Sequence, residues 1–317
     1  MIRPLRSSDA TFDEPGEIAA GLQQAEKMIS PKYFYDERGS QLFDEITRLP
    51  EYYPTKTELG IVQANIAEIT ELVGPQASLI EFGSGSSHKT RTLLENLDQL
   101  AVYVPVDISE EHLLQSARQL RAEFAGLEIL PVVADFTKPF GLPTPSIMPL
   151  RNIVYFPGST IGNFTHDAAH DLLEVMHHEA GEHGALLIGV DLQKDPEVIE
   201  LAYNDSAGVT AEFNVNILRH LNREFGADFD LDTFSHSAEY NEPEGRIEIR
   251  LISSRDQVIA IGGAEISIAE GEGILTEYSH KYTLGGFAQM AGRAGFRVDR
   301  VWTDADNLFS VQYCVRQ

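Results

Sequence analysis

Glycines and acidic residues follow three apolar stretches of this sequence. Gly83 and Gly85 come after the first stretch, Asp107 ends the second, and Asp135 with Phe136 follows the third. Glycine lets a backbone turn sharply and approach a ligand closely, and a carboxylate can accept hydrogen bonds from both ribose hydroxyls. Asp135 could accept a hydrogen bond from an adenine amino group while Phe136 packs on the ring. Together the three positions predict a cradle for an adenosine-containing cofactor.

The glycine segment helps to distinguish between two such cofactors. A dinucleotide site would continue G-x-G-x-x-G, but His88 stands where the third glycine belongs. Glu81, just before the glycines, suits a cofactor that carries an amine better than one that carries two phosphates. These residues favour S-adenosylmethionine (SAM), with NAD as the second choice. A simpler alternative is that the residues form only a strand-to-helix turn, a helix cap and a solvated loop.

The elements that must position these residues follow from the apolar periodicity. Between residues 77 and 191, strand-length apolar runs alternate with helical patterns, which predicts a parallel sheet covered on both faces. The expected strands are 77–82, 102–106, 128–133, 151–156 and 185–190, and the expected helices are 89–100, 112–124 and 167–180. A helix at 284–294 and strands at 297–302 and 309–315 would close this sheet with an antiparallel pair.

The rest of the chain has a different pattern. Residues 15–65 read as helices interrupted by prolines, and residues 196–225 also look helical. Three β-rich stretches at 246–253, 257–261 and 264–269 predict an antiparallel meander. We therefore expect an α/β core formed by 57–191 plus 281–317, and a second, mixed α+β domain formed by 1–56 plus 192–280.

Composition narrows the partners. The 317 residues carry a net charge of −25, which disfavours binding to nucleic acid or to anionic membranes and suits a small zwitterionic or cationic substrate. No apolar run reaches the about 20 residues that span a bilayer, and the N-terminus has no signal-peptide pattern, so we expect a cytoplasmic protein. Histidine spacing and the single cysteine, Cys314, predict no metal site. A self-contained two-domain chain needs no partner, so a monomer is expected.

Several longer segments resemble the L-histidine Nα-methyltransferases of ergothioneine biosynthesis, from about residue 31 to residue 315. They are Pro31–Asp36, Thr47–Glu58, Glu81–Thr90, Gly158–Asn163, Ala202–Tyr203 with Ala207–Thr210, and Leu275–Ser279. The resemblance implies a Rossmann-like class I SAM-dependent methyltransferase core with a second, mixed α+β substrate domain. It also implies SAM as the cofactor and three successive methylations of histidine to its trimethyl betaine, hercynine.

The resemblance further implies the residues of the site. Those that would hold SAM are Tyr35, Gly83, Lys89, Asp107, Asp135 and Phe136. Those that would meet the substrate are Asn163 and Tyr203 at its carboxylate, Tyr35 and Tyr52 near its amine and ring, Gly158 beside it, and Glu277 and Ser279 at its imidazole.

Two of these roles make chemical sense by themselves. A carboxylate and a hydroxyl at positions i and i+2 of a strand, Glu277 and Ser279, can face the two nitrogens of an imidazole together. Tyr35 is the candidate catalytic residue, because the α-amine must lose a proton before it can accept a methyl group. Ile249 stands where the family typically has Met near the substrate ring. Another small aromatic amino acid or amine is therefore the alternative substrate.

Overall fold

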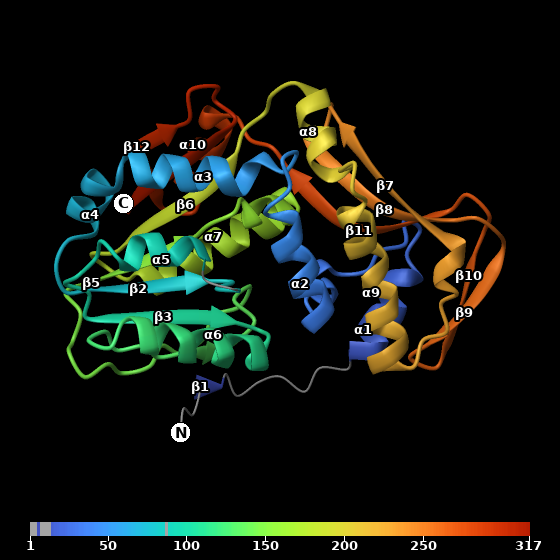
Figure 1. Cartoon of the computed structure of the whole chain (residues 1–317), viewed down its shortest axis with the longest axis horizontal. Helices are drawn as coiled ribbons and strands as arrows, with labels where there is room; N and C mark the ends of the chain where they lie inside the picture. Colours follow the sequence, from blue (N-terminus) through green and yellow to red (C-terminus); the bar gives the residue numbers. More distant parts are fainter. Residues whose placement is uncertain (1–4, 7–13, 86–87) are drawn as a thin grey trace. The chain divides into compact units, whose positions relative to one another are not determined.

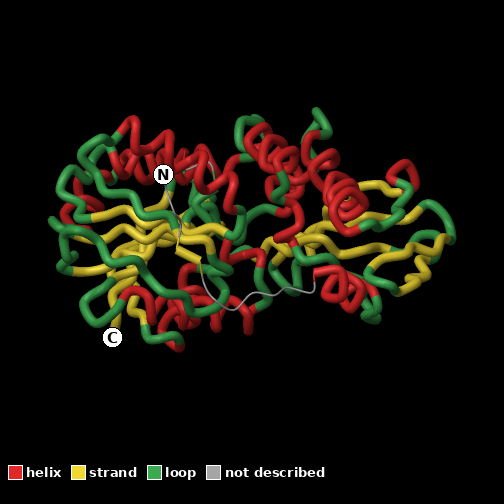
Figure 2. The backbone as a smooth tube through the Cα atoms, turned by 90° about the horizontal axis from the view of Figure 1, so that it is seen from below, coloured by secondary structure: helices red, strands yellow, loops and turns green. Residues whose placement is uncertain are grey.

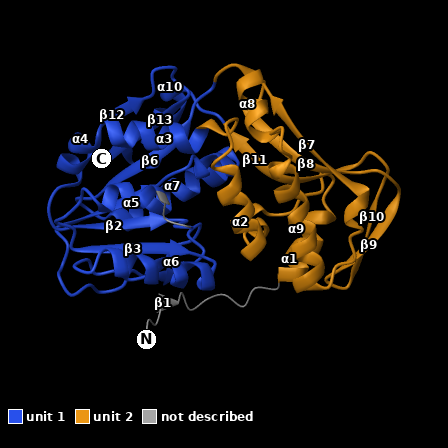
Figure 3. Cartoon of the chain, in the orientation of Figure 1, with its two compact units in different colours: residues 1–9, 54–193, 281–317 blue, residues 10–53, 194–280 orange. Residues whose placement is uncertain are grey.

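The structure is a computed structural model, and it describes all residues except 1–4, 7–13 and 86–87. The chain divides into two compact units (Figure 3). Unit 1 comprises residues 1–9, 54–193 and 281–317, and unit 2 comprises residues 10–53 and 194–280. One assignment was wrong, because residues 1–56 were all expected in the second domain, whereas β1 (Leu5–Arg6) pairs with a strand of the unit 1 sheet. A two-residue strand has no periodicity that a sequence pattern could show.

Within the described residues, unit 1 contains an eight-stranded sheet of order β1-β4-β3-β2-β5-β6-β13-β12. Its other strands are β2 (Ala77–Phe82), β3 (Val102–Asp107), β4 (Val132–Val133), β5 (Arg151–Phe156), β6 (Ala185–Asp191), β12 (Phe296–Thr303) and β13 (Phe309–Arg316). Strands β1 to β6 run parallel, while β13 is antiparallel to β6 and β12 to β13, which confirms the expected closing pair. The strand order reverses between β2 and β5, where open α/β sheets bind their ligands.

Helices cover both faces of this sheet (Figures 1 and 2). One apolar core joins alternate strand residues such as Leu79 and Tyr103 to α3 (Tyr53–Ala64), α4 (Ile66–Val73), α5 (His88–Leu94) and α6 (Glu110–Glu123). The other core joins Ile80 and Val104 to α7 (His166–Ala180) and α10 (Leu284–Arg293). Because both faces are covered, every residue of β2 is buried.

The expected third strand, 128–133, is shorter in the structure. Only Val132–Val133 pairs continuously with β3, while Ile129 makes an isolated bridge to Tyr103. Pro131 lies between them and has no N–H to donate to the ladder. The strand still ends where expected, so Asp135 and Phe136 still follow it.

Unit 2 packs helices against antiparallel strands. Its helical elements are α1 (Glu14–Leu22), η1 (Pro31–Phe34), α2 (Glu37–Ile46), α8 (Pro196–Tyr203), α9 (Val209–Phe225) and η3 (Leu231–Thr233). Its strands are β7 (Phe234–Asn241), β8 (Arg246–Ser253), β9 (Gln257–Ile261), β10 (Ala264–Ile268) and β11 (Gly273–His280). The expected meander was wrong, because β8 pairs with β7 and β11, while β9 and β10 form a separate hairpin.

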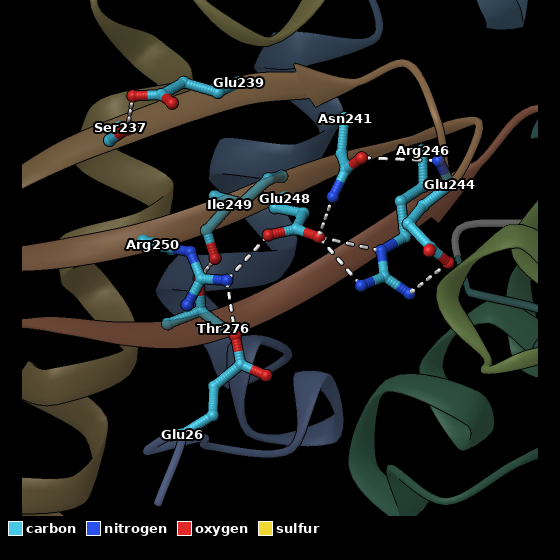
Figure 4. A network of polar contacts seen from close by, with 10 residues as sticks. All are labelled: Glu26, Ser237, Glu239, Asn241, Glu244, Arg246, Glu248, Ile249, Arg250 and Thr276. Carbon is cyan, nitrogen blue, oxygen red and sulfur yellow. Dashed lines mark hydrogen bonds and ion pairs between the residues drawn. The ribbon is translucent and has the colours of Figure 1, made fainter.

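The two faces of β8 differ sharply. Ile247, Ile249 and Leu251 are buried on one face. On the other face, Glu248 accepts hydrogen bonds from Arg246 at 2.8 and 2.9 Å and from Arg250 at 2.7 Å, as Figure 4 shows. Burial alone would raise the pKa of Glu248, but these guanidinium groups lower it to about 2. The charge network therefore fixes which face of β8 turns toward the apolar core.

In the part of the chain that the structure describes, no helix has the length and apolarity needed to cross a membrane.

Candidate functional site

The carboxyl ends of β2 to β6 lie at one edge of the unit 1 sheet, because these strands are parallel. The predicted residues of unit 1 all lie at or just beyond these ends. They are Gly83 after β2, Lys89 at the start of α5, Asp107 at the end of β3, Asp135 and Phe136 after β4, and Gly158 and Asn163 after β5. Ser86 and Ser87, inside the resembling segment Glu81–Thr90, lie outside the described residues.

Gly83 and Phe136 lie in contact at this edge. Gly83 has a φ of 68°, and a Cβ there would lie 3.4 Å from Phe136 Cε1. The Phe136 ring packs against the rings of Phe82 and Phe156, whose centroids lie 5.7 and 5.8 Å away. Phe136 is itself only half-buried. A fixed, partly open aromatic ring beside a glycine is a suitable surface for an adenine ring.

Asp107 joins the glycine loop to the end of β3. Its Oδ2 accepts a hydrogen bond from Gly85 N at 3.1 Å, and its Oδ1 accepts one from Ser109 N at 2.9 Å. Burial raises the pKa of Asp107 above its ordinary value, although these two N–H groups oppose the shift. Each carboxylate oxygen has a second lone pair, so Asp107 can accept further hydrogen bonds from ribose hydroxyls.

Asp135 is tied to its own loop. Its Oδ1 accepts hydrogen bonds from Thr137 N at 3.1 Å and Thr137 Oγ1 at 2.5 Å, and Lys138 Nζ lies 3.2 Å from Oδ2. Burial alone would raise the pKa of Asp135, but these contacts hold it below its ordinary value. The group is therefore an ionised acceptor. Its contacts within the loop also fit the simpler alternative raised from the sequence, so its adenine contact stays a prediction.

Glu81 does not have the role that its place in the sequence suggested. Its side chain is buried, and its two oxygens accept hydrogen bonds from Thr90 Oγ1 at 2.5 Å and from the Tyr103 hydroxyl. Burial raises its pKa to about 8, although both hydroxyls oppose the shift. Strand residues alternate between the two faces, and Glu81 lies on the face covered by α5. We therefore correct the expectation that Glu81 meets a cofactor amine.

One residue in contact with the predicted site was missed from the sequence. Glu58 of α3 is buried, its Oε2 lies 2.6 Å from Lys89 Nζ, and Gly158 N donates hydrogen bonds to its Oε1 at 2.9 Å and its Oε2 at 3.0 Å. It therefore touches two of the predicted site residues. Glu58 ends one of the resembling segments, Thr47–Glu58, and this position was the only signal in the sequence that could have identified it.

The loop after β5 has a strained beginning. Gly158 and Ser159 have φ values of 81° and 57°, and η2 (Thr160–Asn163) follows. The Ser159 hydroxyl accepts a hydrogen bond from Asp191 N at 2.9 Å. The left-handed backbone of this turn thus belongs to Gly158 and Ser159 rather than to Asn163, for which a purely conformational role had been an alternative. This leaves the Asn163 amide available as a recognition group, which is still a prediction.

In unit 2, the structure brings Tyr203 and Ser279 together. The Tyr203 hydroxyl at the end of α8 lies 2.7 Å from Ser279 Oγ on β11. Glu277 is two residues before Ser279 and therefore lies on the same face of β11, where it pairs in register with Ile249. A register shift between Leu275 and Glu277 leaves Thr276 as the extra residue. Such a bulge re-aims the side chains that follow it.

Aromatic rings connect the remaining predicted residues of unit 2. Tyr52 packs edge-on against Tyr203 at 6.2 Å and against Phe43 at 6.4 Å, and Tyr35 packs edge-on against Phe43 at 5.9 Å. Tyr35 keeps 37% of its surface exposed. Tyr35, Tyr52, Tyr203 and Ser279 therefore form one continuous group, with Phe43 as its unpredicted member.

Polar contacts connect the Tyr203 backbone to Thr276 of β11. His236 Nε2 lies 2.9 Å from the Tyr203 carbonyl, and its Nδ1 lies 3.0 Å from Asn214 Nδ2. Because Asn214 Nδ2 can only donate, His236 Nδ1 accepts and Nε2 carries the proton. Thr276 Oγ1 donates to Asn214 Oδ1 at 2.7 Å. The end of α8 and the bulge of β11 are thus linked through two side chains.

Two further groups bear on metal or thiol chemistry. His170, Asp171 and Glu174 on α7 offer ligand atoms within 4.8 Å of one another, but both carboxylates are exposed, and such surface groups are common without an ion. Cys314 is buried, and burial raises its pKa to about 12, so the thiol is not a nucleophile at neutral pH.

The fold and the strand-end residues define a class of protein. A mostly parallel sheet that reverses between β2 and β5, with a glycine turn, a carboxylate and an aromatic ring at successive strand ends, is the Rossmann-like core of a class I SAM-dependent methyltransferase. The cradle beside Gly83 fits the adenosine part of SAM. A family model described as histidine-specific methyltransferase, SAM-dependent, matches residues 14–316. The chain belongs to that family.

Relatives agree with this assignment. The histidine N-alpha-methyltransferase of Mycolicibacterium smegmatis is 41% identical over 95% of this chain and 94% of its own length. That of Mycobacterium tuberculosis is 38% identical, with the same coverage. Ergothioneine biosynthesis protein 1 of Neurospora crassa is 31% identical over 85% of this chain, which corresponds to 31% of that longer protein.

Proposed function

We propose that this chain transfers the methyl group of SAM to the α-amino nitrogen of L-histidine, in three successive steps that end at the trimethyl betaine, hercynine. The observation that carries the proposal is the Tyr203–Ser279 contact of 2.7 Å on the face of β11 that also holds Glu277. These groups can form hydrogen bonds to a small zwitterion that carries an imidazole ring. Family membership and the two N-alpha-methyltransferase relatives support the same substrate.

The residues divide by the part of the reaction they serve. Glu277 and Ser279 meet the imidazole nitrogens, and Asn163 and Tyr203 meet the carboxylate. Gly83, Asp107, Asp135, Phe136, Lys89 and Tyr35 hold SAM. The cofactor supplies a methyl group on a positively charged sulfur, and the protein has to align the amine with it. A charge-assisted contact such as that of Glu277 contributes about 1.5–3 kcal/mol.

Tyr35 and Tyr52 are the residues proposed to act at the amine. An α-ammonium has no lone pair, so it must first lose a proton. Removing water from the amine lowers its pKa, and a tyrosine hydroxyl can accept a hydrogen bond from it while the proton leaves through water. The tyrosine faces also stabilise the methylated ammonium group, which becomes larger with each methylation. Tyr35 is thus the proposed catalytic residue, and Gly158 leaves space beside the substrate.

A direct assay tests this function. The purified full chain is incubated with histidine and SAM that carries a deuterated methyl group, and the products are fragmented in a mass spectrometer. We expect mono-, di- and trimethylhistidine with every label on the α-nitrogen. Label on the imidazole, or none on histidine, would contradict the proposal.

The alternative is a different small aromatic amino acid or amine as substrate. Ile249 bears on the tolerance of other side chains, because it lies directly across from Glu277 and stands where the resemblance implies Met, but it leaves histidine the favoured substrate. Ile is close to Met in volume, so the shape of the pocket changes more than its polarity. We also propose that the enzyme acts as a cytoplasmic monomer on a freely diffusing substrate, without nucleic acid, membrane or metal. Its net charge of −25 supports the absence of polyanionic partners.

A further inference from the structure

Glu58 is a buried carboxylate for which the proposed reaction has no role so far. Its side chain is 2% exposed and lies among three segments of the site edge: the start of α5, the loop after β5, and β6. Lys89 Nζ is 2.6 Å from its Oε2, and Gly158 N donates to both of its oxygens. One acidic group thus joins a predicted cofactor residue to a predicted substrate residue.

The surroundings of Glu58 leave space for this arrangement and for little else. A Cβ at Gly189 of β6 would lie 2.0 Å from Glu58 Oε1, and a Cβ at Gly158 would lie 2.8 Å from Lys89 Nζ. Both distances are shorter than any normal non-bonded contact. A side chain at Gly189 would therefore displace the Glu58 carboxylate, and one at Gly158 would displace the Lys89 ammonium. Glycine at these two positions lets the ion pair reach its place.

The ion pair restricts an otherwise flexible group. Lysine carries its charge on a four-carbon stem with many rotamers, and a buried carboxylate is stable only when it is paired. The Lys89 side chain keeps 19% exposure, and its ammonium has three N–H donors, one of which Glu58 occupies. The other donors can meet the carboxylate of SAM, which is the anionic group of that molecule.

We propose that Glu58 is a positioning residue for the cofactor. It holds the Lys89 ammonium beside the Gly158 turn and acts on SAM through Lys89, without touching SAM itself. The proposal deepens the proposed function and rests on the SAM-binding role given there to Lys89. A general role of Glu58 in stability would give a different result, because here the effect of Glu58 on the affinity for SAM must disappear when Lys89 is removed.

Two variants disturb the pair in different ways. Glu58→Gln removes the charge and keeps the shape, while Gly189→Ala displaces the carboxylate and keeps the charge. We expect each to raise the Kd for SAM roughly tenfold or more, the size of one charge-assisted hydrogen bond, in titration calorimetry on the full chain without histidine. Unchanged SAM affinity in both variants would overturn the proposal.

Two substitutions serve as matched controls. Gly60 is on α3, as Glu58 is, and a Cβ there meets nothing within 4 Å, so Gly60→Ala adds a methyl group without a contact. Glu71→Gln removes the charge of an exposed carboxylate on α4. Both should bind SAM as the natural chain does. A loss of SAM affinity in these controls equal to that in Glu58→Gln would show a general effect of substitution and overturn the specific role.

A double-mutant cycle tests whether Glu58 acts through Lys89. In a Lys89→Met background, Glu58→Gln should leave the Kd for SAM unchanged, and additive losses would overturn the proposal. This comparison needs only Lys89→Met and the double variant to fold, so it remains decisive if Glu58→Gln alone does not. SAM binding is measured without histidine. A natural chain that binds SAM but does not methylate histidine would therefore contradict the proposed function and leave this result standing.

Discussion

At the residue scale, the sheet edge contains partly open side chains, which are the ones proposed to face a ligand, and enclosed side chains that hold the fold. Asp107 and Phe136 are partly open at strand ends, whereas Glu81 is enclosed by Thr90 and Tyr103. The strand-end acids could be predicted because they follow apolar runs. The true surroundings of Glu81 and Glu58 could not, because they depend on helices that pack against the sheet from distant parts of the chain.

Glu81 should make the stability of the protein depend on pH. Its pKa is about 8 in the folded chain against an ordinary value of 4.5, so between these values the folded state binds more protons than the unfolded state. The free energy of unfolding should therefore fall as pH rises from 4.5 to 8, by at most about 1.4 kcal/mol per pH unit from this group. In urea unfolding across this range, Glu81→Gln should give a flatter profile than the natural chain. Equal slopes would show that Glu81 is ionised throughout.

Glu277 should determine affinity for the imidazole. Glu277→Ala should lower kcat/KM for histidine roughly 10- to 100-fold, the range expected for a charge-assisted hydrogen bond, and leave the Kd for SAM unchanged. Glu265→Ala, an exposed glutamate on β10, is the matched control and should change neither quantity. If Glu277→Ala retains full kcat/KM for histidine, the side chain does not read the substrate.

At the scale of elements, segments with a clear apolar or alternating pattern were predictable, and polar segments were not. Strands β2, β5, β8 and β9 have the expected bounds, because each is an apolar or alternating run between turn residues. Strand β7 was missed, because its sequence, FSHSAEYN, is mostly polar and pairs with β8 through its backbone. The pairing of β8 with β11 was also missed, since long-range register is not written in local periodicity.

The first turn of α9 depends on a residue outside the helix. Asp205 accepts hydrogen bonds from Val209 N at 2.9 Å and Thr210 N at 2.8 Å, which satisfies two helix-terminal donors next to Tyr203. Asp205→Ala should destabilise the protein by about 0.5–2 kcal/mol, measured as a lower urea midpoint. Asp205→Asn, which keeps an acceptor oxygen, should recover part of the loss. An unchanged midpoint for Asp205→Ala would exclude this stabilisation.

For the whole molecule, the inserted segment 194–280 leaves unit 1 and returns to it at one place, beside the end of β6. Tyr282 N donates to the Asp191 carbonyl at 2.9 Å, and Gln193 N donates to the Tyr282 carbonyl at 2.9 Å. Beside them, Lys281 Nζ lies 2.8 Å from Asp191 Oδ2, and both side chains are buried. The change of pattern after Asp191 predicted the beginning of the insertion, but the buried pair that closes it could not be seen in either segment alone.

Removing one member of this pair should be costly. Lys281→Met leaves a buried carboxylate without its cation and should lower the free energy of unfolding by about 3–5 kcal/mol. The double variant Asp191→Asn with Lys281→Met should recover most of this loss, because no charge is left uncompensated. Equal losses in the single and double variants would show that the charge pair is not the cause.

The central claim is that this enzyme selects histidine by its imidazole and methylates its α-amine. A competition measures this most directly: the purified chain receives SAM and an equimolar mixture of the twenty amino acids, and mass spectrometry quantifies every methylated product. We expect α-N-methylated histidine to dominate from the earliest time point. Preferential methylation of tryptophan or another amino acid, with histidine left unmodified, would contradict it.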